Sequence, residues 1–279
     1  MTSSVLSPHP ASALEYWFFK VNAGPAALLV DWIARRRVNE NWLRVSIHSP
    51  HKRAVLFEKQ SELFTERSCL SAGRTVGWID DVAWELEIDA SGEWIAPDLF
   101  PARLLRMPDL VLASAPRAAF TGWIQIGDQR AQLQRAPGMV SHYWGRQLAP
   151  EWWWVSASQF DREGVAMECT ILRSGVWGIP VGLPLAYLYL RDGATREFVI
   201  APPALARVTG SPEKFEIQFR RFGAETITVS AQGRDYGDLG DGIVNTLVGD
   251  LEIRKGGRLI ARAQGTAGLE RRAPGSRSD

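Results

Sequence analysis

The chain has 279 residues with 32 basic and 31 acidic side chains, a formal charge of +1. Because these charges are interspersed, no basic surface for nucleic acid is expected. The two cysteines, Cys69 and Cys169, are far apart and form no CxxC pair, so we expect reduced thiols and a cytoplasmic location. No apolar run reaches the length of a transmembrane helix, and no signal-peptide pattern opens the chain. Peripheral contact with a membrane remains an alternative. The compositional anomaly is twelve tryptophans.

The first half of the chain is expected to consist of short strands. Residues 1–13 are rich in Ser and Pro, and we expect them, His9 included, to be extended or disordered. The apolar pattern then predicts strands at 15–19, 26–33, 42–48, 54–59, 75–79 and 82–88. The segment 26–33 is apolar on both faces, and because alanine and leucine have little strand preference, a helix is the alternative there. The segment 97–117 has four prolines and is expected to be irregular. A hairpin is predicted between 119–126 and 130–135, across the turn Gly127-Asp128.

The second half continues the pattern. Strands are predicted at 151–160, 165–172, 185–191, 197–200, 215–219, 226–231, 251–255 and 259–265. Only residues 242–249 are expected to form a short helical turn. The spacing of strands and turns predicts an all-β barrel or sandwich.

The strand after Glu151 has one face of unusual composition. Trp152, Trp154, Ser156, Ser158 and Phe160 point one way by strand alternation. Large aromatic surface mixed with small hydroxyls is typical of a ligand cavity, which has apolar walls and a few polar groups. A core strand whose serines bond the backbone is the alternative.

His142 is the main candidate for chemistry. It is expected in a loop between aromatic residues, where an imidazole can act as general acid or base near neutral pH. A loop histidine that only bonds the backbone is the alternative. His48 and His51 lack further ligands nearby, so no metal site is expected. No nucleotide or nucleophile-elbow motif occurs, so no cofactor is expected.

Several carboxylates lie within aromatic segments, where burial could raise a carboxyl pKa and create a general acid. They are Glu15, Asp31, Glu151 and Glu168, each of which could instead be a rim charge or part of an ion pair. Asp31 stands out because it interrupts the apolar run LLVDWI, where an unpaired charge is costly. Tyr187 and Tyr189 share one strand face and could add hydroxyls to a cavity.

The sequence also contains a weak internal similarity, which we call the sequence echo. Glu15-Tyr16-Trp17 opens the first strand region much as His142-Tyr143-Trp144 opens the second. Two related β-halves would account for it.

The central motifs resemble a known family. His142-Tyr143-Trp144-Gly145-Arg146, then Pro150-Glu151-Trp152-Trp153-Trp154-Val155 and Phe160, resemble the signature of the tocopherol cyclase, carotenoid hydratase and AttH-like group. The opening YWFFKV and the closing GDLEI are similar to the first strand and the last hairpin of that family. The resemblance implies two lipocalin-like domains, at 14–136 and 137–270, with tails at 1–13 and 271–279.

The family also implies a function. Its members include cofactor-independent cyclases and hydratases that act on isoprenoids, and lipocalin-like pericyclases of polyketide pathways share related architecture. The hydratase branch has an Asp before the motif histidine, which is thought to supply the proton, whereas this chain has Ser141. Hydration would therefore require Asp31, Glu15 or Glu168 as the replacement acid.

We therefore expect a cofactor-free cyclase or isomerase for a hydrophobic polyene, polyketide or isoprenoid. The expected catalytic residues are His142, Asp31 and Glu168. The expected pocket residues are Trp17, Tyr143, Trp144, Trp152, Trp154, Ser156, Ser158 and Tyr187. The alternatives are a lipid or pigment carrier and a carotenoid-hydratase-like lyase. The sequence does not indicate an oligomeric state.

Overall fold

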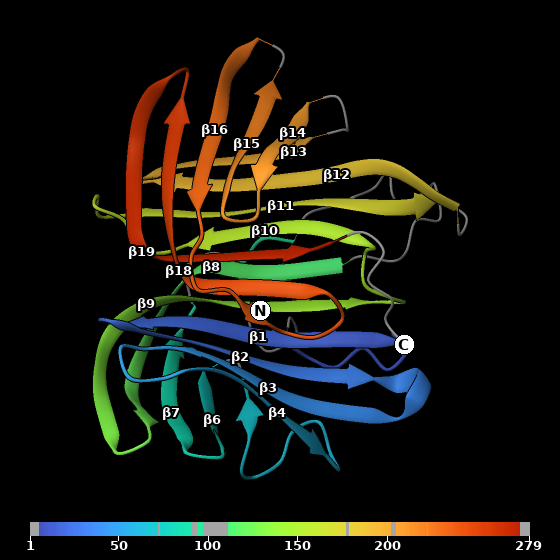
Figure 1. The fold of residues 1–279 in the computed structure, drawn as a ribbon, viewed down its shortest axis with the longest axis vertical. Helices are drawn as coiled ribbons and strands as arrows, with labels where there is room; N and C mark the ends of the chain where they lie inside the picture. Colours follow the sequence, from blue (N-terminus) through green and yellow to red (C-terminus); the bar gives the residue numbers. More distant parts are fainter. Residues whose placement is uncertain are drawn as a thin grey trace. The chain divides into compact units, whose positions relative to one another are not determined.

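The computed structural model describes residues 6–71, 73–90, 94–96, 111–176, 179–201, 205–221 and 223–273. Within these ranges the chain is built from antiparallel strands, with one short 3-10 turn at Arg36–Val38. This confirms the all-β prediction. Contacts divide the chain into two compact units, the first ending at Leu148 and the second containing Ala149 onward. Each unit is built on one sheet (Figure 1).

The first sheet has the strand order β4-β3-β2-β1-β9-β8-β7-β6-β5 in the part of the chain that the structure describes. The strands are β1 (Leu14–Ala23), β2 (Ala26–Arg35), β3 (Glu40–His48), β4 (Arg53–Gln60), β5 (Cys69–Leu70), β6 (Arg74–Ile79), β7 (Val82–Asp89), β8 (Val111–Ile126) and β9 (Gln129–Gly145). They confirm the strands and the hairpin predicted from apolar alternation, including the turn at Gly127-Asp128.

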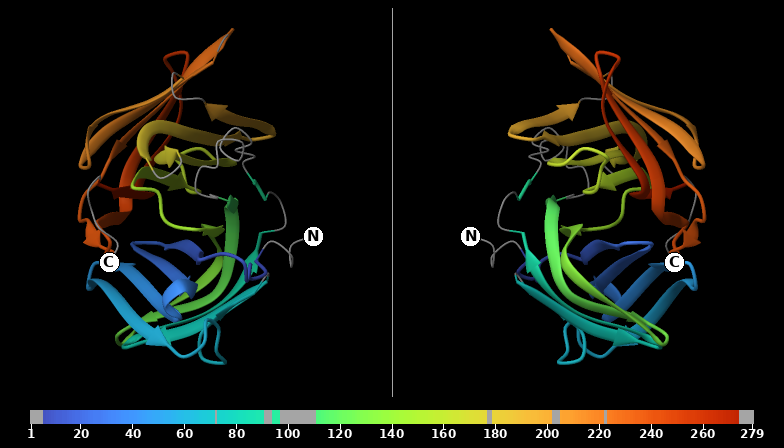
Figure 2. Two further views of the ribbon diagram at one scale, coloured as in Figure 1. Left: turned by 90° about the vertical axis from the view of Figure 1, so that its right-hand side faces the viewer. Right: turned by 90° about the vertical axis from the view of Figure 1, so that its left-hand side faces the viewer.

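This sheet curls around its own hydrophobic cluster. The rings of Trp32 on β2 and Trp84 on β7 lie 6.2 Å apart, although three strands separate β2 from β7 in the sheet. Four steps of about 4.8 Å would separate them by about 19 Å in a flat sheet. The strands must therefore bend toward each other, as Figure 2 shows. We call the face that bears Trp17, Phe19 and Val21 the concave face, because these residues belong to that cluster.

The two halves of the sequence echo pair with each other. In the antiparallel register of β1 and β9, Glu15 is opposite Trp144, Tyr16 is opposite Tyr143 and Trp17 is opposite His142. The interpretation of the echo as the openings of two separate halves is therefore wrong, since both triplets lie in one sheet. The similar residues form one paired aromatic region in the first unit.

β8 and β9 are longer than the sequence predicted. β8 includes residues 111–117, which were expected to be irregular, and residues 97–110 lie outside the described ranges. The register shifts between Ala115 and Ala118, so Pro116 lies at a bulge, where its missing N–H does not interrupt the ladder. β9 continues to Gly145, so the domain boundary expected after residue 136 falls inside this strand.

The second sheet has the order β13-β12-β11-β10-β19-β18-β16-β15-β14 in the described ranges, with β17 paired to β18. The strands are β10 (Glu151–Ala157), β11 (Val165–Val176), β12 (Ile179–Asp192), β13 (Thr195–Ala201), β14 (Ala206–Ser211), β15 (Lys214–Arg221), β16 (Ala224–Gln232), β17 (Gly237–Asp238), β18 (Ile243–Lys255) and β19 (Arg258–Arg272). The helical turn predicted at 242–249 is wrong, because β18 occupies most of that segment. The expectation of a tail from residue 271 is wrong at its start, since β19 reaches Arg272, and residues 274–279 lie outside the described ranges.

The second sheet also curls around a hydrophobic cluster. The rings of Trp153 on β10 and Phe215 on β15 are 4.6 Å apart, although three strands lie between β10 and β15. Trp153, Val155 and Ala157 point into this cluster. Trp152, Trp154 and Ser156 therefore occupy the opposite face of β10, as strand alternation predicted.

The segment before β1 is fixed to the first unit from Leu6 onward. Leu6 is buried, and the Ala13 N–H donates to the Gly145 carbonyl at 3.0 Å. The Arg36 N–H donates to the Ala13 carbonyl at 2.9 Å. These backbone bonds give residues 6–13 a defined path where a disordered segment was expected, and residues 1–5 lie outside the described ranges.

Within the described ranges, none of the helical segments has the length and apolarity required to cross a membrane. Cys69 and Cys169 are both free thiols, as the sequence predicted.

Candidate functional site

His142 lies on β9 and has no solvent exposure, so the loop expected around it is replaced by a strand. Its cross-strand partner is Trp17, and the two rings stack at a centroid distance of 4.6 Å and an angle of 14°. Trp144, two residues along the same face, has its ring centroid 4.6 Å from the imidazole. His142 is therefore an aromatic-packed imidazole on the concave face of the first sheet.

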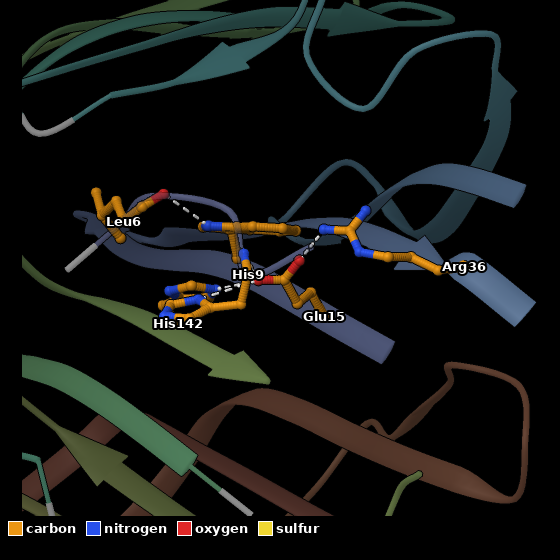
Figure 3. A network of polar contacts seen from close by, with 6 residues as sticks. Leu6, His9, Glu15, Arg36 and His142 are labelled. Carbon is orange, nitrogen blue, oxygen red and sulfur yellow. Dashed lines mark hydrogen bonds and ion pairs between the residues drawn. The ribbon is translucent and has the colours of Figure 1, made fainter. Parts of the chain in front are cut away.

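Glu15 is the acidic partner of His142 (Figure 3). Its Oε1 lies 3.2 Å from His142 Nε2 and 3.2 Å from His9 Nδ1, and it accepts the His9 backbone N–H at 2.7 Å. Its Oε2 accepts a hydrogen bond from Arg36 Nη2. An ionised carboxylate only accepts hydrogen bonds, so these histidine nitrogens carry protons when they bond to it.

The environment of Glu15 favours its charged form. Burial raises the pKa of this carboxyl, but the hydrogen bonds from His142 and the His9 N–H and the Arg36 charge outweigh that effect, so the net pKa is lowered. Glu15 is thus a buried carboxylate at neutral pH. A hydrogen bond to such a carboxylate fixes the tautomer and the orientation of an imidazole.

His9 completes the group and was not identified from the sequence. Its ring stacks on Trp144 at a centroid distance of 4.1 Å and an angle of 6°. Its side chain is 36% exposed, whereas the side chains of Glu15 and His142 are fully buried. No local pattern in the Ser- and Pro-rich start of the chain predicts this contact. We call His9, Glu15, Arg36 and His142 the histidine cluster.

Among the residues that the structure describes, three members of the histidine cluster could together hold a metal ion. His9, Glu15 and His142 each offer one ligand atom, and these atoms lie within 4.8 Å of one another. Two imidazoles and one carboxylate form a common donor set for zinc. However, both ring nitrogens and the His9 N–H bond to one oxygen, Oε1, and Arg36 bonds to the other. A metal would have to replace most of this network, so the donor set fits only after rearrangement.

Asp31 is not part of this cluster. It is the cross-strand partner of Phe18 and Arg44, which places it on the face of the first sheet opposite His142. Its Oδ2 accepts a hydrogen bond from Arg44 Nε at 2.9 Å, and both side chains are buried. The charge inside the apolar run is therefore neutralised by an ion pair.

Ser141 also points away from His142. It precedes His142 on β9, so strand alternation places its side chain on the opposite face, where its hydroxyl donates to the Ala113 carbonyl at 3.2 Å. A carboxylate at this position would lie on the same side as Asp31. In this chain the carboxylate beside His142 is Glu15.

Five other residues named from the sequence gather in the second unit, on the face of the sheet opposite its hydrophobic cluster. Glu168 is fully buried, its Oε1 accepts the Trp154 indole N–H at 3.0 Å, and Ser156 is its cross-strand partner. Tyr187 is buried, and burial, with the nearby Glu168 charge, raises its pKa well above the usual value. Tyr189, opposite Glu168 on β12, adds a buried hydroxyl. We call this set the Glu168 group.

The remaining predicted pocket residues join neither set. Tyr143 is half-buried, and its hydroxyl donates to the Gln147 carbonyl at 2.8 Å. The Trp152 indole donates to Glu270 Oε1 at 2.9 Å, and Arg272 lies over its ring. Ser158 follows the end of β10. A hollow of about 650 Å³ in the second unit is lined by residues of β14, β15, β16, β18 and β19, and none of the predicted site residues is among them.

The sequence of this chain has limited similarity to known proteins. No known family profile matches the chain. A Mycobacterium tuberculosis protein, described as uncharacterized, is 27% identical over 201 residues, which are 68% of this chain and 60% of that protein. The chain thus spans 60% of the length of this relative.

Several solved structures have a similar fold at low identity. Kievitone hydratase from Nectria haematococca has a TM-score of 0.67 and 9% identity, with 97% of this chain and 91% of that chain covered. An AttH protein of Nitrosomonas europaea has a TM-score of 0.66 and 12% identity, with 95% and 93% covered. CghA, in its structure with Sch210972, has a TM-score of 0.59 and 15% identity, with 94% and 89% covered. This chain therefore has the same fold as these three structures, as the resemblance of its central motifs implied.

Proposed function

We propose that this protein is a cofactor-independent enzyme that cyclises or isomerises a hydrophobic small molecule, with His142 as its proton-transferring group. The observation that carries the proposal is the contact of His142 Nε2 with the ionised Glu15 at 3.2 Å, inside a stack of tryptophan rings. The kinship of the fold with a hydratase and with CghA is consistent with small-molecule chemistry.

The proposed reaction needs only a proton that His142 donates and later takes back. His142 donates a proton to one carbon of an alkene or polyene, and the cationic carbon that forms is attacked by a second double bond or loses a neighbouring proton. In the first course the ring closes and the cation moves to a carbon of the second double bond, which then loses a neighbouring proton. In the second course the loss of the proton itself shifts the double bond. The neutral imidazole then takes up the released proton, so no cofactor or water is consumed.

The residues around His142 support the proton transfer and the cationic intermediate. Glu15 is the positioning residue, because its carboxylate bonds His142 Nε2 and orients the imidazole. The faces of Trp17 and Trp144 stabilise a nearby cation through their π electrons. These rings also exclude water, which would otherwise capture a cationic intermediate.

Hydration is less well supported than cyclisation or isomerisation. Asp31 and Ser141 lie on the opposite face of the sheet from His142, so neither the family position nor Asp31 offers an acid beside the imidazole. Glu15 lies beside it, but a lowered pKa makes that carboxyl a poor acid.

The test is product formation from a lipophilic extract of the source organism. Wild-type protein, His142→Ala and the control His51→Ala are each incubated with the extract, and products are analysed by chromatography and mass spectrometry. His51 lies in an exposed turn. We expect a product of unchanged mass but new retention time, equal for wild type and His51→Ala, and reduced by about 10²–10⁴-fold for His142→Ala.

Other outcomes contradict the proposal in defined ways. A bound compound released unaltered would identify a carrier, and a product heavier by one water would identify a hydratase. His142→Gln separates chemistry from packing, because it retains a side chain that can bond Glu15 but cannot transfer the proton. If His142→Gln matches wild type in turnover, His142 is not the proton-transferring group.

A further inference from the structure

The His9 ring occupies a position that a substrate would need in order to reach His142. It stacks almost parallel on Trp144, 4.1 Å from its centroid, and its own centroid is 5.2 Å from that of His142. His142 and Glu15 have no exposed surface, whereas the His9 side chain is 36% exposed. His9 and Arg36, whose side chains are 36% and 30% exposed, are thus the partly exposed members of the histidine cluster, and His9 is the one whose ring stacks on Trp144.

Hydrogen bonds hold the segment that carries His9 at both ends, and Leu6 at its start is buried in the hydrophobic cluster. The Trp17 indole N–H donates to the Leu6 carbonyl at 2.9 Å, and the His9 N–H donates to Glu15 at 2.7 Å. At the end next to β1, the Ala13 N–H donates to the Gly145 carbonyl at 3.0 Å. No strand of the sheet includes residues 6–13. Because these residues are outside the β-ladder, the part of the segment around His9 can shift without breaking the ladder.

We propose that the His9 position is a ligand subsite, in which a planar conjugated group with a hydrogen-bond donor stacks on Trp144 in place of the imidazole. Residues 6–13 are the strap that moves aside when the ligand enters. The inference rests on the proposed function of His142, because it describes how a substrate reaches that residue.

The contacts of His9 define the chemistry of the group that replaces it. Trp144 offers a flat aromatic face, so the incoming group is flat and conjugated. Glu15 Oε1 loses two donors, the His9 N–H and Nδ1, when the strap moves, and a buried carboxylate with lost donors is unfavourable. The incoming group therefore supplies an N–H or O–H. Phenols, enols and azoles meet both requirements, whereas a plain hydrocarbon meets only the first.

The experiment removes His9 and offers small probes for the vacated subsite. His9→Ala is titrated with 4-methylimidazole, phenol and toluene by ligand-observed NMR, and near-UV circular dichroism checks that the variant is folded. We expect 4-methylimidazole and phenol to bind His9→Ala at least tenfold more tightly than wild type, and toluene to bind at least tenfold more weakly than phenol.

Two further variants test whether the probes bind at the position that His9 vacates. His9→Phe refills the subsite with a ring and should abolish the gain in probe binding. His9→Ala combined with Trp144→Ala removes the stacking face and should also abolish it. Equal binding to wild type and His9→Ala, or unchanged binding in the double variant, would overturn the proposal.

A measurement on the wild-type protein covers the case in which His9→Ala does not fold. Hydrogen exchange of the peptide spanning residues 6–13 should become faster at saturating phenol, while that of β1 stays unchanged. If exchange in residues 6–13 does not change, the strap does not move for such ligands. These readouts are independent of turnover, so probe binding without product formation would reject the proposed reaction and retain the subsite.

Discussion

Lys20 shows how strongly one residue can depend on its surroundings. It lies on β1, on the face opposite the hydrophobic cluster, is 2% exposed, and its Nζ donates to Asn22 Oδ1 at 2.5 Å. Burial lowers its pKa from 10.5 to about 7. Because the charged form loses hydration in this position, folding favours the neutral amine.

This shift predicts a pH dependence of stability. Between about pH 7 and 10.5 the unfolded chain holds a proton on Lys20 that the folded protein lacks, so the free energy of unfolding rises with pH in this window. Lys20→Met removes the titrating group. We expect Lys20→Met to be more stable than wild type near pH 7, by about 1–3 kcal/mol, with the difference shrinking toward pH 10. Denaturant unfolding of both proteins from pH 6 to 10 measures it, and a constant difference would show that Lys20 stays charged when folded.

The sequence identified His142 and the carboxylates as candidates but could not pair them. Aromatic neighbours marked His142, and Glu15 was one of four carboxylates in such segments. The pair is separated by 127 residues and forms only through the register of β1 and β9. Asp31 was selected for its apolar neighbours, yet alternation along β2 directs it to Arg44 on the other face.

At the scale of single elements, the β1–β9 pair organises the first unit. Gly138 on β9 lies opposite Val21 of β1 and Ala118 of β8. A Cβ at Gly138 would lie 2.2 Å from the Lys20 carbonyl oxygen and 2.5 Å from the Phe120 ring. This close approach lets β1 and β9 pack over Phe120.

Gly138→Ala should therefore weaken the first unit. The methyl group would meet backbone, which cannot move aside, so we expect a loss of about 1–3 kcal/mol in the free energy of unfolding. Gly73→Ala is the matched control, because a Cβ there has no atom within 4 Å. Urea unfolding monitored by tryptophan fluorescence measures both. Equal stabilities of the two variants would mean that β1 and β9 adjust without cost.

Most strands followed from local pattern, and the failures share one cause. Strict alternation predicted β3, β6 and β7 correctly, because one side of each strand faces the cluster. The ends of β8 and β9 were missed because Pro116 and the glycine-containing start of the central motif suggest a turn. Pairing with neighbouring strands, which a single segment does not reveal, overrides that preference.

At the scale of the whole molecule, each unit encloses its own hydrophobic cluster and one cysteine. Cys69 in the first unit is half-buried. Cys169 in the second is fully buried, and burial, with the Glu168 charge, raises its pKa. Since the thiolate is the reactive form, Cys169 should be inert in the folded protein.

Thiol labelling can therefore report unfolding of the second unit. At pH 8 we expect the folded protein to react at one thiol and the denatured chain at two. Cys69→Ser should leave the folded protein unreactive, and labelling of that variant during urea unfolding should follow the exposure of Cys169. Rapid reaction of folded Cys69→Ser would show that the second cluster opens without global unfolding.

By itself, the sequence determined the fold class, most strand positions, the hairpin at Gly127-Asp128 and the resemblance to the hydratase and AttH-like group. These features follow from apolar periodicity and from motifs that lie within short segments. Only the tertiary structure decided that His142 lies in a strand, that Glu15 is its partner and that His9 covers both. Those contacts depend on which strands pair and in which register, and on a terminal segment held by a few bonds. Long-range pairing is set by the burial of whole faces, which no local pattern specifies.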